Sequence, residues 1–139
     1  MNETKTHRGV CHCGAVAFEA QFDLSKGVGR CNCSICHKLG MSTAQMKPPA
    51  FKLTKGEDQL TQYRMKGGGD AYRAFCKTCG VQMYGAGNIP EIGGEFVSVN
   101  VNTLEGVELA GLPEMHFDGR HDNWEAGPRE KSWPLLAKA

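Results

Sequence analysis

The arrangement of seven cysteines is the feature of this sequence that most constrains how the chain can fold. They fall into three tight groups and none lies elsewhere: Cys11-His12-Cys13, Cys31-Asn32-Cys33-Ser34-Ile35-Cys36 and Cys76-Lys77-Thr78-Cys79. An odd number of cysteines would leave one thiol over in a disulfide framework. In a reducing compartment, clustered cysteines more often serve as metal ligands or catalytic groups. Ordinary buried thiols would be scattered through the chain, so the pattern predicts metal binding.

Zinc is the metal that this pattern favours. Two cysteines one or two residues apart can direct both sulfurs at one point about 2.3 Å from each, as a tetrahedral zinc site requires. Gly14 and Gly80 each follow a cysteine directly, and glycine permits the tight turn that points amide N–H groups at a thiolate. An iron–sulfur cluster also uses thiolates and is the main competing interpretation.

The number of cysteines indicates that one metal site is incomplete. Two tetrahedral zinc ions need about eight ligands between them, and the chain offers seven cysteines. The remaining position would be filled by His, a carboxylate, water or a substrate. A closed site of four protein ligands is typical of structural zinc, whereas an open position is the usual mark of catalytic zinc.

The spacing leaves two ways to divide the cysteines. The more compact division gives a closed site of Cys11, Cys13, Cys76 and Cys79, and an open site of Cys31, Cys33 and Cys36. The other is a zinc-ribbon-like site of Cys33, Cys36, Cys76 and Cys79, which would leave a mixed set from two distant segments. The first division is preferred because one six-residue segment then supplies all three ligands of the open site.

The sequence between the cysteines predicts a mainly β fold of several short strands. Val16, Phe18, Ala20 and Phe22 alternate with less apolar residues, and so do Val97, Val99 and Val101. This period of two is typical of strands with one buried face. Shorter candidates are Phe51–Thr54, Leu60–Met65, Ala71–Cys76 and Val81–Gly85, separated by turn signals that include Gly67–Asp70. Short helical turns are expected at Ser34–Leu39 and near Thr103–Gly106.

Length and charge fit one small domain with no nucleic-acid partner. The chain has 139 residues and a formal net charge of +1, which does not predict the basic face of a nucleic-acid-binding protein. It has no apolar run near the length of a membrane span, and its polar N-terminus lacks the pattern of a signal peptide. A cytoplasmic location without membrane association is therefore expected. The sequence does not decide whether the tail wraps over the domain, nor the oligomeric state.

At the cysteine groups the chain resembles the glutathione-dependent formaldehyde-activating (GFA) family. Three segments carry the resemblance: Arg8–Val16, Arg30–Cys36 and Arg73–Tyr84. Val99-Asn100-Val101 and the spacing Pro113…His116…Trp124 are also similar to that family. The resemblance defines a GFA-like core of about residues 8–124 in a single domain of residues 1–139, and 125–139 form a C-terminal tail.

The resemblance implies a fold, two zinc ions and an activity. The fold would consist of several short coiled antiparallel sheets stapled by zinc, like methionine sulfoxide reductase B and a Rab-associated zinc protein. A structural Zn²⁺ would be held by Cys11, Cys13, Cys76 and Cys79, and a catalytic Zn²⁺ by Cys31, Cys33 and Cys36. The chemistry would be that of a carbon–sulfur lyase, which condenses glutathione or a related thiol with formaldehyde or a similar aldehyde to an S-hydroxymethyl adduct.

Other functions compete with this hypothesis, and other polar residues are candidates for a role in it. A non-catalytic zinc-stabilised protein-interaction module would have the same fold, and a methionine sulfoxide reductase would need a cysteine free of metal, of which the chain has none spare. His12 and His37 adjoin cysteines, so each is a candidate for the eighth ligand. His116 is expected to be structural. Candidates for binding the carboxylates of glutathione, weighed against ordinary surface charges, are Arg30, Lys38, Arg64 and Arg73.

Overall fold

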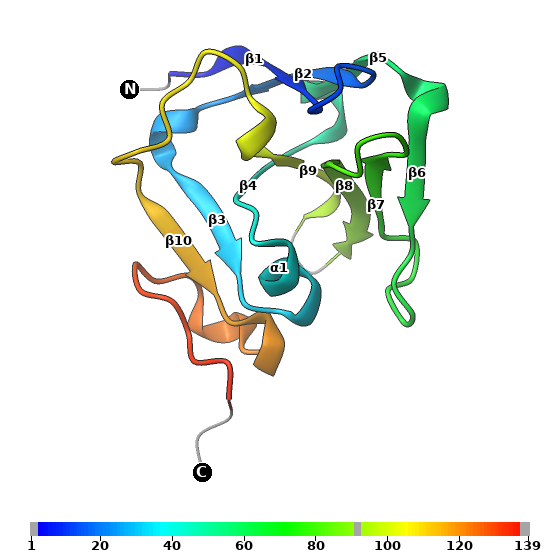
Figure 1. Ribbon diagram of the computed structural model, residues 1–139. Helices are drawn as coiled ribbons and strands as arrows, with labels where there is room; N and C mark the ends of the chain where they lie inside the picture. Colours follow the sequence, from blue (N-terminus) through cyan, green and yellow to red (C-terminus); the bar gives the residue numbers. More distant parts are fainter. Residues whose placement is uncertain (1–2, 91–92, 137–139) are drawn as a thin grey trace.

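The computed structural model describes residues 3–90 and 93–136 and shows a mainly β protein with two sheets, as the sequence predicts (Figure 1). Its strands are β1 (Lys5–Val10), β2 (Ala17–Phe22), β3 (Val28–Cys31), β4 (Thr43–Met46), β5 (Phe51–Lys55), β6 (Leu60–Tyr63), β7 (Tyr72–Cys76), β8 (Gln82–Ile89), β9 (Gly94–Asn100) and β10 (Glu114–Phe117). The α-helix α1 spans Ser34–Leu39. Short 3₁₀ helices are η1 (Leu24–Lys26), η2 (Pro48–Ala50), η3 (Glu57–Gln59), η5 (Val101–Thr103), η6 (Gly119–His121) and η7 (Trp124–Ala126).

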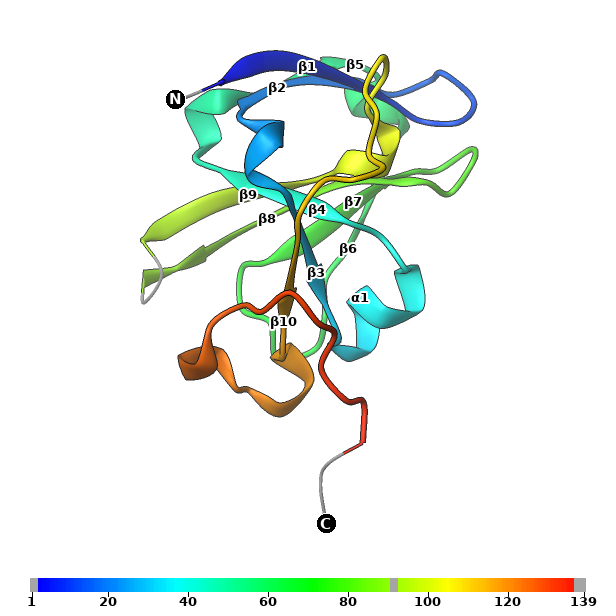
Figure 2. The ribbon, with the colours of Figure 1, turned by 90° about the vertical axis from the view of Figure 1, so that its left-hand side faces the viewer.

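The smaller sheet is antiparallel and has the strand order β1-β2-β5. Its central strand β2 is the alternating segment at residues 16–22, in which Phe18, Ala20 and Phe22 are buried whereas Gln21 is exposed. Alternation places these apolar side chains on one face of the pleated strand. Figures 1 and 2 show this sheet lying across one end of the larger one.

The larger sheet has the order β10-β3-β4-β9-β8-β7-β6. Its pairs are antiparallel except for β10 beside β3, which is parallel. This parallel pair differs from the expected antiparallel sheets. The chain between β9 and β10 runs back to the end of the sheet at which β3 begins. β10 therefore runs in the same direction as β3. The second alternating segment is in β9, where Val97 and Val99 are buried, but Val101 begins η5 instead of extending the strand.

The core lies between the two sheets. Phe18 from β2, Met83 from β8 and Val99 from β9 are fully buried in one apolar cluster. Aromatic rings continue this cluster, with the Phe51 and Tyr84 ring centroids 4.6 Å apart. This burial holds together the strands from which the cysteine groups project, because removing apolar surface from water is the main stabilising term in folding.

The C-terminal segment lies against the larger sheet as far as Pro134, whose carbonyl accepts from Asn32 Nδ2 at 3.3 Å. Arg129 exchanges backbone hydrogen bonds with His116 of β10 at 2.7 and 3.1 Å, and the Trp133 indole Nε1 donates to the His116 carbonyl at 2.8 Å. Figure 2 shows this segment passing in front of β10 and β3. Every helix in the described part of the chain is too short to cross a membrane.

Candidate metal centres

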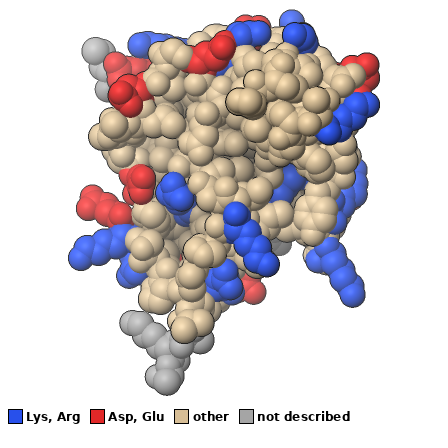
Figure 3. Space-filling model, in the orientation of Figure 1, with Lys and Arg blue, Asp and Glu red and all other residues tan. Residues whose placement is uncertain are grey.

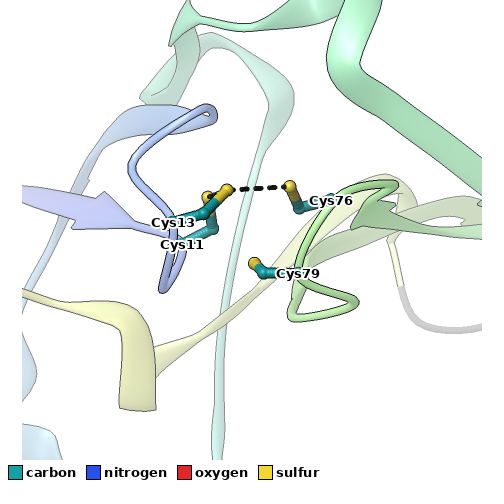
Figure 4. A group of neighbouring side chains, drawn as sticks. All are labelled: Cys11, Cys13, Cys76 and Cys79. Carbon is teal, nitrogen blue, oxygen red and sulfur yellow. Dashed lines mark hydrogen bonds between the residues drawn. The ribbon is translucent and has the colours of Figure 1, made fainter.

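The first group of cysteines joins the two sheets. Cys11 and Cys13 follow β1 of the smaller sheet, Cys76 ends β7 of the larger sheet, and Cys79 lies in the turn before β8. All four sulfur atoms lie within 4.8 Å of one another. Figure 4 shows them pointing toward a common point from two separate loops. A ligand at that point would tie the two sheets together.

The sulfur separations in this group fit a tetrahedral metal site. The Cys11 and Cys13 Sγ atoms are 3.7 Å apart, and the Cys13 and Cys76 Sγ atoms are 3.6 Å apart. A tetrahedron with zinc–sulfur bonds of 2.3 Å places its sulfurs about 3.8 Å apart. A disulfide would bring two sulfurs to about 2.05 Å, and all seven cysteines are free.

The backbone around this group forms two tight turns. The Val16 N–H donates to Cys11 Sγ at 3.3 Å, and the Gly80 N–H donates to the Cys76 carbonyl at 2.7 Å. Gly14 and Gly80 have φ angles of +83° and +79°, which only glycine adopts without strain. Burial raises the pKa of Cys79, but amide N–H groups of Val81 and Cys13 outweigh it and lower that pKa to about 6.

The second group brings together Cys31, Cys33 and Cys36, whose sulfur atoms lie within 4.8 Å of one another. Cys31 ends β3, Cys33 is the N-cap of α1, and Cys36 lies in its first turn. The N–H of Cys33 donates to Cys31 Sγ, and the N–H of Cys36 donates to Cys33 Sγ, both at 3.5 Å. One strand end and one helical turn therefore aim three half-buried sulfurs at one point.

The electrostatics of this group favour a bound cation. Hydrogen bonding from the Cys31 thiol, and then from Cys36, lowers the pKa of Cys33. The same neighbours, Cys31 first and then Cys33, raise the pKa of Cys36. One thiolate forms readily, but further negative charge beside it is unfavourable. A soft divalent cation such as zinc relieves this repulsion and matches the sulfur donor set, so the residues present fit the metal.

The structure thus keeps the four-cysteine and three-cysteine groups apart. In the described part of the chain, Cys33 and Cys36 are not grouped with Cys76 and Cys79, as a zinc ribbon would require. His12 and His37 are exposed, and neither joins either group there. His116 contacts Glu114 through Nε2 at 3.1 Å and pairs with the tail. The identity of the metal ligands remains a prediction.

Asn32 connects the second group to the segment after β10. This buried residue lies between Cys31 and Cys33, and its Nδ2 donates to Asp118 Oδ1 at 2.8 Å. Its Oδ1 accepts from the Arg120 N–H at 3.0 Å. Burial of Asp118 opposes ionisation, but donors from Asn32 and His121 prevail and lower its pKa. Sequence reasoning missed this network because its partners are 86 residues or more apart and no local motif marks them.

The segment held by Asn32 packs directly against the second group. A Cβ placed on Gly119 would lie 2.6 Å from Cys31 Sγ and 2.9 Å from Cη2 of Trp124. The Trp124 side chain, 57% exposed, therefore lies close to this sulfur at the protein surface.

Basic side chains surround the second group. Arg30 precedes Cys31 and donates to Gly40 O and Ser42 Oγ at the two ends of the α1–β4 connection, and Lys38 is exposed on α1. The Arg120 Nε donates to the Asn32 carbonyl at 2.9 Å. Figure 3 shows Lys and Arg outnumbering Asp and Glu over the part of this face that surrounds α1. Arg64, by contrast, is exposed and donates to the Asp70 carbonyl.

Comparison with known proteins agrees with this geometry. Residues 6–118 match the family described as glutathione-dependent formaldehyde-activating enzyme. A crystal structure of a Rhodobacter sphaeroides protein is also similar, with a TM-score of 0.65 and 31% sequence identity over 77% of this chain and 98% of that chain. The match includes all seven cysteines of the two groups and most of the chain that the structure describes. The chain therefore belongs to the glutathione-dependent formaldehyde-activating enzyme family.

Proposed function

We propose that this protein is a zinc-dependent carbon–sulfur lyase that joins glutathione, or a related thiol, to formaldehyde or a similar aldehyde. The thiol sulfur forms a bond to the carbonyl carbon, the π electrons pass to oxygen, and the proton lost from the thiol is taken up there. The product is an S-hydroxymethyl adduct. The chain would carry two zinc ions and act in the cytoplasm, where thiols are reduced.

The observation that carries this proposal is the difference between the two cysteine groups. Four clustered sulfurs of the first group would complete a tetrahedron around a metal ion, whereas the three sulfurs of Cys31, Cys33 and Cys36 would leave one position for substrate. Zinc held by three sulfurs acidifies a coordinated thiol and polarises a carbonyl. A non-catalytic protein-interaction module is not favoured, because the family is one of enzymes.

The protein side chains would bind and orient the thiol. Glutathione carries two carboxylates at neutral pH, and Arg30 of β3 and Lys38 of α1, on the two elements that carry the three cysteines, would supply positive charge for them. The exposed indole of Trp124 offers an apolar surface near Cys31 for the methylene group next to the thiol. Formaldehyde is small enough to need little recognition, so the binding energy comes from the thiol and serves to position it.

The proposal is tested by the rate at which free formaldehyde and the adduct interconvert. With ¹³C-labelled formaldehyde and glutathione at equilibrium, exchange NMR measures this rate without an added coupling enzyme. The zinc-loaded protein should accelerate exchange in proportion to its concentration. The Cys33→Ser variant, which removes one sulfur from the open group, should leave the exchange rate at that of the uncatalysed reaction.

Two controls make the result decisive. Protein treated with a chelator should lose the acceleration and regain it when zinc is added back. A thiol without carboxylates, such as 2-mercaptoethanol, should exchange more slowly than glutathione at equal concentration if the basic side chains bind the substrate. Exchange that is equally fast with wild-type and Cys33→Ser protein would refute the proposed function.

A further inference from the structure

Among the residues that the structure describes, Arg73 is the one basic side chain with a hydrogen bond to a sulfur of the open group. It lies in β7, three residues before Cys76 of the first group. Its Nη2 donates to Cys36 Sγ at 3.3 Å. The same strand thus brings a ligand to one cysteine group and a guanidinium to the other. Arg73 is half-buried, unlike the solvated surface charge that was the competing interpretation of its sequence position.

The position of Arg73 is prepared by the neighbouring strand. Gly85 of β8 is its partner in the ladder, and a Cβ on Gly85 would lie 3.7 Å from Arg73 Cγ. That distance is an ordinary van der Waals contact, so the aliphatic part of the Arg73 side chain packs beside the backbone of Gly85 in β8. The guanidinium meanwhile reaches Cys36 of α1.

Charge explains why a guanidinium is suited to this place. Three thiolates and one divalent cation carry a net charge of −1, and a guanidinium stays protonated at any physiological pH. A hydrogen bond from a charged N–H donor to a thiolate is stronger than one between neutral groups. The guanidinium thus offsets the excess negative charge of the loaded site.

The rest of the guanidinium is poorly satisfied by the protein. Its Nε is buried and has no hydrogen-bond partner among the residues that the structure describes. Burying such a donor is unfavourable, so Arg73 is poorly explained by its contribution to folding alone. Its contact with Cys36 gives a functional reason for it.

We propose that Arg73 is a positioning residue of the open site, which holds the Cys36 sulfur in place through its N–H donor and offsets the negative charge of the three ligating sulfurs. Outer partners that hydrogen-bond to metal ligands commonly change metal affinity about 10–100-fold. This inference rests on the proposed metal assignment of Cys31, Cys33 and Cys36. It adds a residue from a distant strand to that site.

The test compares cobalt-loaded variants, because cobalt replaces zinc and makes sulfur ligation visible. The variants are Arg73→Met, which removes the charge and the donor, and Arg73→Lys, which keeps the charge. Arg64→Met is the matched control, since Arg64 is exposed and bonds to the Asp70 carbonyl rather than to sulfur. Subtracting the spectrum of Cys33→Ser isolates the open site, and competition with a chelator gives its affinity.

Arg73→Met should bind the second cobalt ion about 10–100-fold more weakly, while affinity at the four-cysteine site stays unchanged. Its sulfur-to-cobalt charge-transfer band should move to lower energy, because losing an N–H donor raises the energy of the sulfur electrons. Arg73→Lys should lie between Arg73→Met and the wild type, and Arg64→Met should match the wild type.

The outcomes separate this inference from the proposed function. Arg73→Met with wild-type affinity and an unmoved band would overturn the inference alone. A loss of both cobalt ions together would show that Arg73 only supports the fold, and it would overturn the inference too. Wild-type protein that binds a single cobalt ion, even in excess, would contradict the proposed open site and this inference with it.

Discussion

At the residue scale, removing one sulfur from the open group should abolish chemistry without unfolding the chain. Cys33 is half-buried at the surface end of β3 and α1, away from the apolar core. We expect Cys33→Ser to bind one zinc ion instead of two and to keep the wild-type circular dichroism spectrum. Metal content measured by atomic emission on gel-filtered protein checks this. A variant that keeps both ions, or that unfolds, would contradict the assignment.

Gly119 is a second residue whose size should matter. Its Cβ would be only 2.6 Å from Cys31 Sγ, and such overpacking costs about 1–3 kcal/mol. We expect Gly119→Ala to weaken metal binding at the open site and to change Trp124 fluorescence, with a small fall in thermal stability. Gly29→Ala is the control, because its new Cβ comes no closer than 3.3 Å to its neighbours. Equal metal affinity in both variants would show that the close approach has no role.

Individual cysteines were predictable from the sequence, but their polar partners were not. Two cysteines within a few residues of each other indicate a metal-binding turn by their spacing alone. Arg73 and Asn32 carry no such signal, because an arginine or asparagine within a few residues of a cysteine does not by itself indicate a sulfur or carboxylate partner. Their contacts with Cys36 and Asp118 depend on strand pairing and on a segment 86 residues away. Such contacts emerge only from the fold.

At the scale of elements, the four-cysteine group should act as a staple between β1 and the β7–β8 turn. Structural zinc sites contribute about 10–16 kcal/mol of apparent binding energy, as much as the whole stability of a typical domain, about 5–15 kcal/mol. We therefore expect Cys79→Ser to unfold the protein or to lower its thermal midpoint far more than Cys33→Ser does. Thermal denaturation of the two variants side by side measures the difference. Equal midpoints would contradict separate structural and open sites.

The elements themselves were predicted unevenly. Six strand segments were placed by alternation or by short β-branched runs, and the helical turn at Ser34–Leu39 agrees with α1. The strands β1, β3, β4 and β10 were missed. They lack a clear alternation of apolar and polar residues: β1 is mostly polar, β3, β4 and β10 have four residues each, and β3 meets β4 through a single residue pair. Their pairing is imposed by tertiary contacts, which override weak local preference.

At the scale of the whole molecule, metal should hold the two sheets together. The core cluster packs residues of both sheets, but a 139-residue chain whose seven cysteines gather in two clusters should gain much of its stability from metal binding. We expect a strong chelator to remove the open-site ion first, with loss of activity at unchanged secondary structure. Removal of the second ion should then lower the free energy of unfolding sharply. Tryptophan fluorescence and metal content, measured as the chelator is added, report the order in which the ions leave. Simultaneous loss of both ions would contradict the expected order.

The central claim is that Cys31, Cys33 and Cys36 form an open metal site that admits a thiol. The most direct measurement is a titration of cobalt-loaded protein with glutathione, monitored at the sulfur-to-cobalt charge-transfer band. The account predicts a band that rises and saturates with glutathione in the wild type, and no change in Cys33→Ser. A band that stays flat in the wild type while two cobalt ions are bound would contradict it.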